Sequence, residues 1–353
     1  MPYDQQFPDG HSVSKGVMRI TRSLQALWSK ISLISCARVI TLMGICILTG
    51  SLIAMHSTPK AFAIQAEPTA DWSYYIHTTS TSTAYTLGCD QGKYDASHSN
   101  VNSEVILAFG GEYSDAGGTK SYVGGPPLTN GQIIAIADEF SHGYWLCTGS
   151  DSTSILRLGI GTNNSYSGVS YAGGQSWAND VATVNSYNAS TGYSSQVAVE
   201  GANDIEPSWW NPSDSMSWSQ GYASVGNGLY IDFGSADGCP TNSYDNSQYC
   251  NNGWSQYDEW YVSWGSPPAM SAPEIYFQAL ADQWTMISLY GAQYQNAAVR
   301  MQGPMDEYDL DTSTFTPTQA WNALWNDLNS YSATAQNMFF ALEIHIDCWT
   351  VAC

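Results

Sequence analysis

The middle of the chain reads Ile155-Leu-Arg-Leu-Gly-Ile-Gly-Thr-Asn163, and this run decides the fold that we expect. Large apolar side chains occupy every second position, and small or polar side chains lie between them. Because successive side chains of a strand point to opposite faces, the run predicts a strand with one apolar face and one narrow, polar face. The apolar face is formed by Leu156, Leu158 and Ile160, and the other face by Arg157, Gly159, Gly161 and Asn163.

Seven further runs predict strands of the same kind, and stretches with helical spacing separate several of them. The helical stretches are centred on Phe140, Trp284 and Trp321, and the last begins with the N-cap pattern Thr316-Pro-Thr-Gln319. Alternating strands and helices predict an α/β fold with a parallel sheet. The seven runs are residues 84–89, 105–110, 196–200, 229–233, 272–277, 298–302 and 339–346.

About eight such units in about 250 residues fit a single-domain (β/α)8 barrel of the TIM type. A doubly wound open sheet is the alternative. Helices would cover both faces of an open sheet, and both faces would then need apolar side chains. The small and polar second face of the predicted strands therefore favours the barrel.

Residues 1–63 predict a signal peptide. A basic region with Arg19, Arg22, Lys30 and Arg38 precedes an uncharged apolar run over residues 39–55, and Ala61-Phe-Ala63 has the pattern of a cleavage site. We therefore expect residues 64–353 to be a secreted domain. An uncleaved membrane anchor that keeps the domain outside the cell is the alternative, because 17 apolar residues are at the short end of a membrane span.

The expected secreted domain is strongly acidic. Its four Lys and Arg residues stand against 29 Asp and Glu residues, which gives a net charge of −25. Nucleic acid is excluded as a partner because phosphate binding needs a basic face, and binding to anionic lipid is disfavoured. The sequence leaves the oligomeric state open.

Six cysteines in an exported chain predict disulfide bonds. Short loops favour Cys239–Cys250 and Cys348–Cys353, the second closing the C-terminal tail, and they leave Cys89–Cys147 as the third pair. Two cysteines spaced as in zinc sites are absent from the sequence, and residues 306–311 lack the glycine and distal Glu of a calcium loop. We expect no metal and no cofactor.

Carboxylates end several predicted strands on the narrow polar face, where active sites of such barrels lie. Converging carboxylates repel, so some should have raised pKa values, and an unequal pair can cleave a glycosidic bond. The alternative is a structural core in which Arg157 and Arg300 neutralise carboxylates. The catalytic candidates are Asp90, Glu200, Asp204, Glu206 and Asp232, and the substrate-binding candidates are Glu112, Asn163, Trp209, Trp210, Trp264, Glu274 and Tyr276.

The densest local motif is Val199-Glu-Gly-Ala-Asn-Asp-Ile-Glu-Pro-Ser-Trp-Trp210. Asp204 and Glu206 are two residues apart, so in an extended segment they would face the same way. The paired Trp209 and Trp210 could stack on sugar rings. An acidic, solvated loop is the alternative interpretation.

Five short runs resemble secreted glycoside-hydrolase-like barrels of bacteria, and together they cover most of residues 80–330. In plan the chain is also similar to lysozyme-like and chitinase-like barrels, which place Asp-x-Glu after the fourth strand. Asp204-Ile-Glu206 matches that piece, whereas the repeated Asp residues that precede it in chitinases are absent. The five runs are Gly88-Cys-Asp-Gln91, Gly159-Ile-Gly-Thr-Asn-Asn164, Gly201-Ala-Asn-Asp-Ile-Glu-Pro207, Gly234-Ser-Ala-Asp-Gly-Cys-Pro240 and Pro273-Glu-Ile-Tyr276.

The resemblance implies an extracellular protein that acts on a polysaccharide or cell-wall glycan. In the enzyme hypothesis the general acid is Glu206 or Glu200, and the partner carboxylate is Asp232 or Asp204. A non-catalytic carbohydrate-binding or cell-surface structural protein on the same barrel is the alternative.

Overall fold

A computed structural model of the chain describes residues 65–98, 101–114, 117–121, 124–149, 151–226, 228–310 and 312–346. The predicted signal peptide and the predicted Cys348–Cys353 bond lie outside the described residues. The strands are β1 (Ala70–Tyr75), β2 (Asn102–Glu112), β3 (Thr119–Lys120), β4 (Ile155–Asn163), β5 (Val197–Asp204), β6 (Tyr230–Asp232), β7 (Ala269–Ser271), β8 (Met305–Asp306) and β9 (Ala341–Ile346). The helices of five or more residues are α2 (Thr81–Ser97), α3 (Asn130–Cys147), α4 (Tyr171–Thr191), α5 (Pro212–Val225), α6 (Gln256–Trp260), the π-helix η3 (Tyr261–Gly265), α7 (Gln278–Tyr294) and α8 (Pro317–Asn329), and short 3₁₀ turns are η1 (Tyr193–Ser195), η2 (Asn251–Gly253) and η4 (Tyr308–Leu310).

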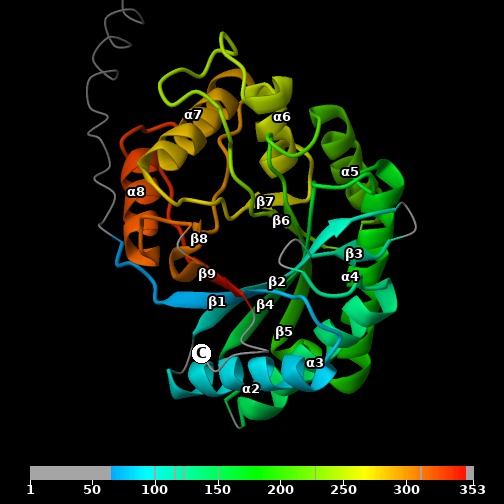
Figure 1. Cartoon of the computed structure of the whole chain (residues 1–353). Helices are drawn as coiled ribbons and strands as arrows, with labels where there is room; N and C mark the ends of the chain where they lie inside the picture. Colours follow the sequence, from blue (N-terminus) through cyan, green and yellow to red (C-terminus); the bar gives the residue numbers. More distant parts are fainter. Residues whose placement is uncertain are drawn as a thin grey trace, which may run out of the picture. The chain divides into compact units, whose positions relative to one another are not determined.

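The strands form one curled sheet in the order β7-β6-β5-β4-β2-β1-β9-β8, with β3 added beside β2. All pairs are parallel except the β2–β3 pair. The helices lie around the outside of the strands (Figure 1). Parallel bridges from Ser271 to Met301 and from Glu274 to Met305 link β7 to the chain that enters β8. The prediction of an α/β fold with a parallel sheet is confirmed.

Five of the predicted strands are present, as β2, β4, β5, β6 and β9. The prediction of a strand at 84–89 is wrong, because these residues belong to α2. Ala84, Gly88, Gln91 and Asp95 are buried at helical spacing. Strand β1 was not predicted from the sequence.

The predicted strands at 272–277 and 298–302 are also wrong and are reduced to isolated bridges. Pro273 has no amide hydrogen to donate to a strand ladder. In the second segment the side chain of Gln336 bonds the amide of Met301 at 2.9 Å and the carbonyl of Val299 at 3.0 Å. These contacts occupy groups that a neighbouring strand would otherwise bond.

The helices centred on Phe140, Trp284 and Trp321 are confirmed as α3, α7 and α8. Helix α8 begins with the predicted capping box, in which the Thr316 side chain accepts from the amide of Gln319 and the Gln319 side chain accepts from the amide of Thr316. In the part of the chain that the structure describes, no helix has the length and apolarity needed to cross a membrane.

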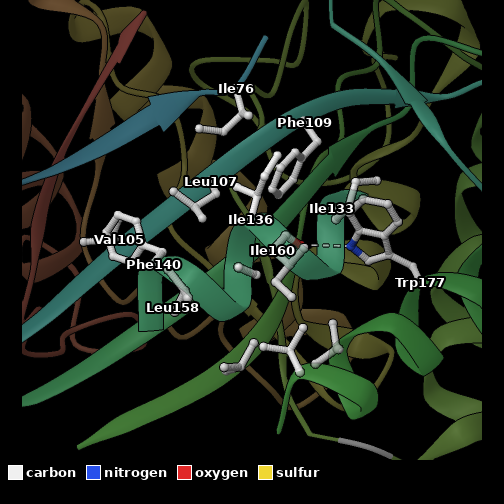
Figure 2. Packing of buried hydrophobic residues seen from close by; sticks show 14 of the residues in the cluster. Ile76, Val105, Leu107, Phe109, Ile133, Ile136, Phe140, Leu158, Ile160 and Trp177 are labelled. Carbon is white, nitrogen blue, oxygen red and sulfur yellow. Dashed lines mark hydrogen bonds between the residues drawn. The ribbon is translucent and has the colours of Figure 1, made fainter. Parts of the chain in front are cut away.

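The largest apolar core lies between the outer face of the sheet and helices α3 to α5. Val105, Leu107 and Phe109 of β2 point toward Ile136 and Phe140 of α3 (Figure 2). The indole of Trp177 packs in the same layer and donates to the carbonyl of Ile160 at 2.9 Å. Burial of these side chains fixes which face of β2 and β4 turns toward the helices, and therefore which face turns inward.

Helices α2 and α3 are joined covalently and packed at backbone contact. The predicted Cys89–Cys147 disulfide links them, and the predicted Cys239–Cys250 disulfide closes the loop after β6. A Cβ atom at Gly88 would lie 2.1 Å from the carbonyl oxygen of Phe140, so only glycine fits there. At three more helix glycines an added Cβ atom would lie 2.0–2.1 Å from a carbonyl oxygen of a neighbouring helix: Gly143 faces Tyr85, Gly174 faces Trp218, and Gly221 faces Tyr171.

Candidate functional site

Four carboxyl groups gather at the carboxyl ends of β5, β7 and β8. Asp204 is the last residue of β5, Glu206 lies two residues beyond it, and Glu274 follows β7. Carboxylate oxygens of these three residues all lie within 4.8 Å of one another. Glu307 directly follows β8, and its charge acts on all three. We call Asp204, Glu206, Glu274 and Glu307 the carboxylate cluster.

Local hydrogen bonds fix the backbone that carries this cluster. The side chain of Asn164, just beyond β4, accepts from the amide of Glu206 at 3.1 Å and donates to its carbonyl at 3.0 Å. Glu274 bridges Met305, so the chain after β7 lies beside β8. Tyr75, the last residue of β1, donates its hydroxyl hydrogen to Glu307. Four separate strand ends are therefore held around one point.

Burial and mutual repulsion favour the protonated forms of Asp204, Glu206 and Glu274. Burial, with the charge of Asp237, raises the pKa of Glu206 to about 8. Burial and the charge of Glu206 raise the pKa of Asp204 well above its usual range. The pKa of Glu274 is raised in the same way, by burial and by the charge of Asp204. At neutral pH the cluster therefore contains protonated carboxylic acids that can donate a proton.

Glu206 is the most exposed member of the cluster, at 9%, against 2% for Asp204 and 4% for Glu274. Trp209 lies one turn beyond it, with its amide donating to the Glu206 carbonyl at 3.1 Å, and its side chain is half-buried. Tyr276 is buried, and its hydroxyl bonds Glu274. Three carboxylate oxygens at this spacing could alternatively hold a hard divalent cation.

Glu200 lies apart from this cluster, in the amino-terminal half of β5. Arg157 bonds it from β4 and also forms an ion pair with Glu104 of β2 at 3.1 Å. β5 continues to Asp204, four residues beyond the predicted strand end, so Glu200 lies two pleat repeats before the carboxyl edge of the sheet. Glu200 is therefore held in an ion pair with Arg157, away from the carboxylate cluster.

Asp232 lies on the opposite face from the prediction. On β6 the side chains of Ile231 and Phe233 belong to the apolar cluster inside the curled sheet. Tyr230 and Asp232 consequently face the helices, where Ser263 donates to Asp232 at 2.6 Å. The rule that large apolar groups face outward fails here because the interior near β6 is apolar.

Glu112 and Asp90 also lie away from the cluster. A β-bulge between Ala108 and Gly111, with Gly110 at φ 84°, inserts one residue and reverses the faces of β2. Glu112 therefore turns to the helix layer, where Trp218 donates to it at 2.9 Å. Asp90 is exposed on α2 and pairs with Lys93 at 3.0 Å.

The remaining candidates also lie outside the carboxylate cluster. Asn163 ends β4 and accepts hydrogen bonds from Ser165. Trp210 donates to Asp214 at 2.9 Å, in the first turn of α5. Trp264 lines a pocket with residues that precede β6 and β7, at the opposite end of these strands from the cluster. Arg300 is exposed, so the predicted buried ion pair is wrong there.

Sequence reasoning missed Glu307 and Tyr75. Glu307 stands in the run Asp306-Glu-Tyr-Asp-Leu-Asp311, whose acidic side chains by themselves resemble a calcium loop and not a catalytic segment. Strand β1 was not predicted, so its last residue had no place in the predicted site. An apolar alternation at residues 70–75 would have been the available signal.

Among solved structures, an endo-1,4-beta-mannanase from Rhizomucor miehei is similar to this chain at 12% identity, with 80% of this chain and 87% of that chain covered and a TM-score of 0.38. A sugar phosphate isomerase/epimerase from Parabacteroides distasonis is similar at 12% identity, with 83% and 93% covered and a TM-score of 0.33. No protein-family model matches the chain, and no curated protein matches its sequence.

Proposed function

We propose that this chain is an extracellular glycoside hydrolase, with Glu206 as the general acid and Glu307 as the partner carboxylate. One observation carries the proposal: four carboxyl groups converge at the carboxyl ends of parallel strands. Within the described residues, none of the four is paired with Lys or Arg. Charges gathered purely for structure would be expected to have such partners, as Glu104 and Glu200 do.

The roles follow from the surroundings of each group. Glu206 is protonated at neutral pH and is the cluster member closest to solvent, so it can donate a proton to a leaving oxygen. Glu307 accepts a hydrogen bond from Tyr75 and is thereby oriented as nucleophile or base. A protonated acid beside an accepting carboxylate is the pair that glycoside hydrolysis requires.

We also propose that the sheet closes into a complete (β/α)8 barrel. The strand order places β8 and β7 at the two edges of the sheet, and the two bridges from β7 toward β8 support closure. Secretion after removal of residues 1–63 is likewise proposed. The two disulfides support it, because such bonds persist in oxidising compartments. A glycan is the proposed substrate, and half-buried Trp209 would stack on its rings.

The test is a screen of the purified full chain against polysaccharides, with release of reducing ends as the readout. On a substrate that the parent cleaves, we expect Glu206→Gln and Glu307→Gln to lower kcat by about 100-fold or more. Asp90→Asn is the matched control, because it removes an exposed carboxylate on α2. Full activity in both Gln variants would overturn the assignment.

A second candidate function is glycan binding without cleavage. Deep burial favours it, since every member of the carboxylate cluster is at most 9% exposed. The same screen separates the two, because a binding protein would retain a glycan and release no product. Trp209→Ala should weaken retention in either case.

A further inference from the structure

A second group of metal-type ligands lies on the outer face of β9. Leu342 and Ile344 belong to the apolar cluster inside the curled sheet, so Glu343 and His345, at the alternate positions, point outward. Asp309 reaches them from the 3₁₀ turn η4, and its Oδ2 lies 3.4 Å from Nδ1 of His345. One ligand atom from each of Asp309, Glu343 and His345 lies within 4.8 Å of the others.

Neighbouring strands frame this group. Asp306 of β8 is paired in register with Glu343, and Tyr74 of β1 is paired with His345. The indole of Trp72 lies against the imidazole, with ring centroids 4.9 Å apart. The imidazole plane is therefore held by packing from β1, while its edge is directed at the carboxylates.

Several polar atoms of this group have no hydrogen-bond partner among the residues that the structure describes. Glu343 is only 8% exposed, yet its Oε1 has no hydrogen-bond partner. Nε2 of His345 and Oδ2 of the fully buried Asp306 also have none. No Lys or Arg of the described ranges forms an ion pair here. Buried polar atoms without partners are costly, and three carboxylates without a cation favour binding of one.

We propose that Asp309, Glu343 and His345 bind a divalent transition-metal ion of the Zn²⁺ type. One imidazole nitrogen with two carboxylate oxygens is a three-ligand set that leaves a coordination position open. Ca²⁺ takes six to eight oxygen ligands, so the nitrogen argues for a transition metal. Donor atoms around tetrahedral Zn²⁺ are about 3.4 Å apart, so side-chain adjustments of about 1 Å would suffice.

This site was not expected from the sequence, and it does not depend on the proposed function. Its ligands are separated by 34 residues between Asp309 and Glu343, and they meet only because η4 folds onto β9. Bound metal would tie η4 to the sheet. Glu307 stands two residues before Asp309, so the same ion would also restrain the segment that carries one member of the carboxylate cluster.

The test is a titration of the metal-free full chain with Zn²⁺, measured by calorimetry and by the intrinsic tryptophan fluorescence, to which Trp72 contributes from beside His345. We expect saturable binding that is weakened about tenfold or more in Asp309→Asn and lost in His345→Ala. Asp309 has an exposed side chain, so its variant should fold normally, which circular dichroism checks. Co²⁺ should give visible bands that both variants weaken.

The matched control is His142→Ala. His142 pairs with Glu139 at 3.3 Å on the surface of α3, which is the same two-residue contact without a third ligand. Binding should be unchanged in this variant. The proposal is overturned if Zn²⁺ does not bind, if Asp309→Asn and His345→Ala bind as the parent does, or if only Ca²⁺ binds at these residues.

Discussion

Arg157 holds Glu200 through two parallel hydrogen bonds, from Nε to Oε1 at 3.1 Å and from Nη2 to Oε2 at 2.6 Å. This bidentate contact, together with the ion pair to Glu104, neutralises charge in the amino-terminal half of the sheet interior. The carboxylate cluster at the other end of the strands has no such cation within the described residues. The two ends of the interior are therefore electrostatically different.

We predict that Arg157→Met destabilises the fold by about 3–5 kcal/mol at pH 8, because Glu104 and Glu200 lose their counter-charge. Burial raises the pKa of Glu104 from 4.5 to about 8. The folded protein therefore keeps a proton that the unfolded chain releases, and stability falls as pH rises through this window. The loss of stability in the variant should be smaller at pH 5, where Glu104 is protonated and needs no counter-charge.

Urea unfolding at pH 5 and pH 8 measures this effect. Arg300→Met is the control, because Arg300 is exposed, and it should change stability by less than about 0.5 kcal/mol. Equal losses for the two variants would contradict the assigned role of Arg157.

We predict that Asp237→Asn moves the alkaline limb of the pH profile to lower pH. If protonated Glu206 is the acid, kcat/KM should fall as pH rises through about 8. Removing the negative charge of Asp237 lowers the pKa of Glu206, so activity should be lost earlier. A carboxyl ¹³C NMR titration of Glu206 gives the same information without a substrate, and an unmoved midpoint would exclude the coupling.

The two disulfides should differ in their contribution to stability. Cys89 and Cys147 are 58 residues apart, and Cys239 and Cys250 are 11 apart. In the chain-entropy model the longer loop contributes about 4 kcal/mol and the shorter about 3 kcal/mol. Replacing each pair by serine and comparing urea unfolding should show the larger loss for Cys89–Cys147. The opposite order would mean that native-state effects exceed loop entropy.

Gly88→Ala should destabilise the protein by about 1–3 kcal/mol or more, because its new methyl group would meet backbone and not a movable side chain. Gly131→Ala in α3 is the control. A Cβ atom there meets nothing within 4 Å, so the change should stabilise by up to about 1 kcal/mol. Thermal unfolding of both variants shows whether each change raises or lowers the stability of the protein.

The sequence predicted the parallel α/β fold because apolar alternation survives wherever helices cover a strand. It predicted β4 and its faces correctly, since Leu156 and Leu158 pack on the helix layer. The prediction failed where local backbone geometry determines the direction of a side chain. The bulge at Gly110 turned Glu112 outward, and no composition rule reveals an inserted residue.

The site was predictable where strand and loop are contiguous, as for Asp204 and Glu206. The prediction that Glu274 lies at the carboxyl edge of the sheet is correct, although its segment forms an isolated bridge and not a strand. Glu307 could not be placed, because β8 has only two residues and leaves too little alternation to detect. Asp232 was misplaced because side-chain size does not show which face of the curled sheet is apolar.

Close backbone contacts at glycines join α2 to α3 and α4 to α5, and in each pair both helices contribute a glycine. We therefore expect each of these helix pairs to move away from the sheet as one unit, and not as two separate helices. Helix α2 follows β1, whose last residue, Tyr75, bonds Glu307. A displacement of the α2–α3 pair would thus be transmitted through β1 to the Tyr75 hydroxyl group in the proposed catalytic centre.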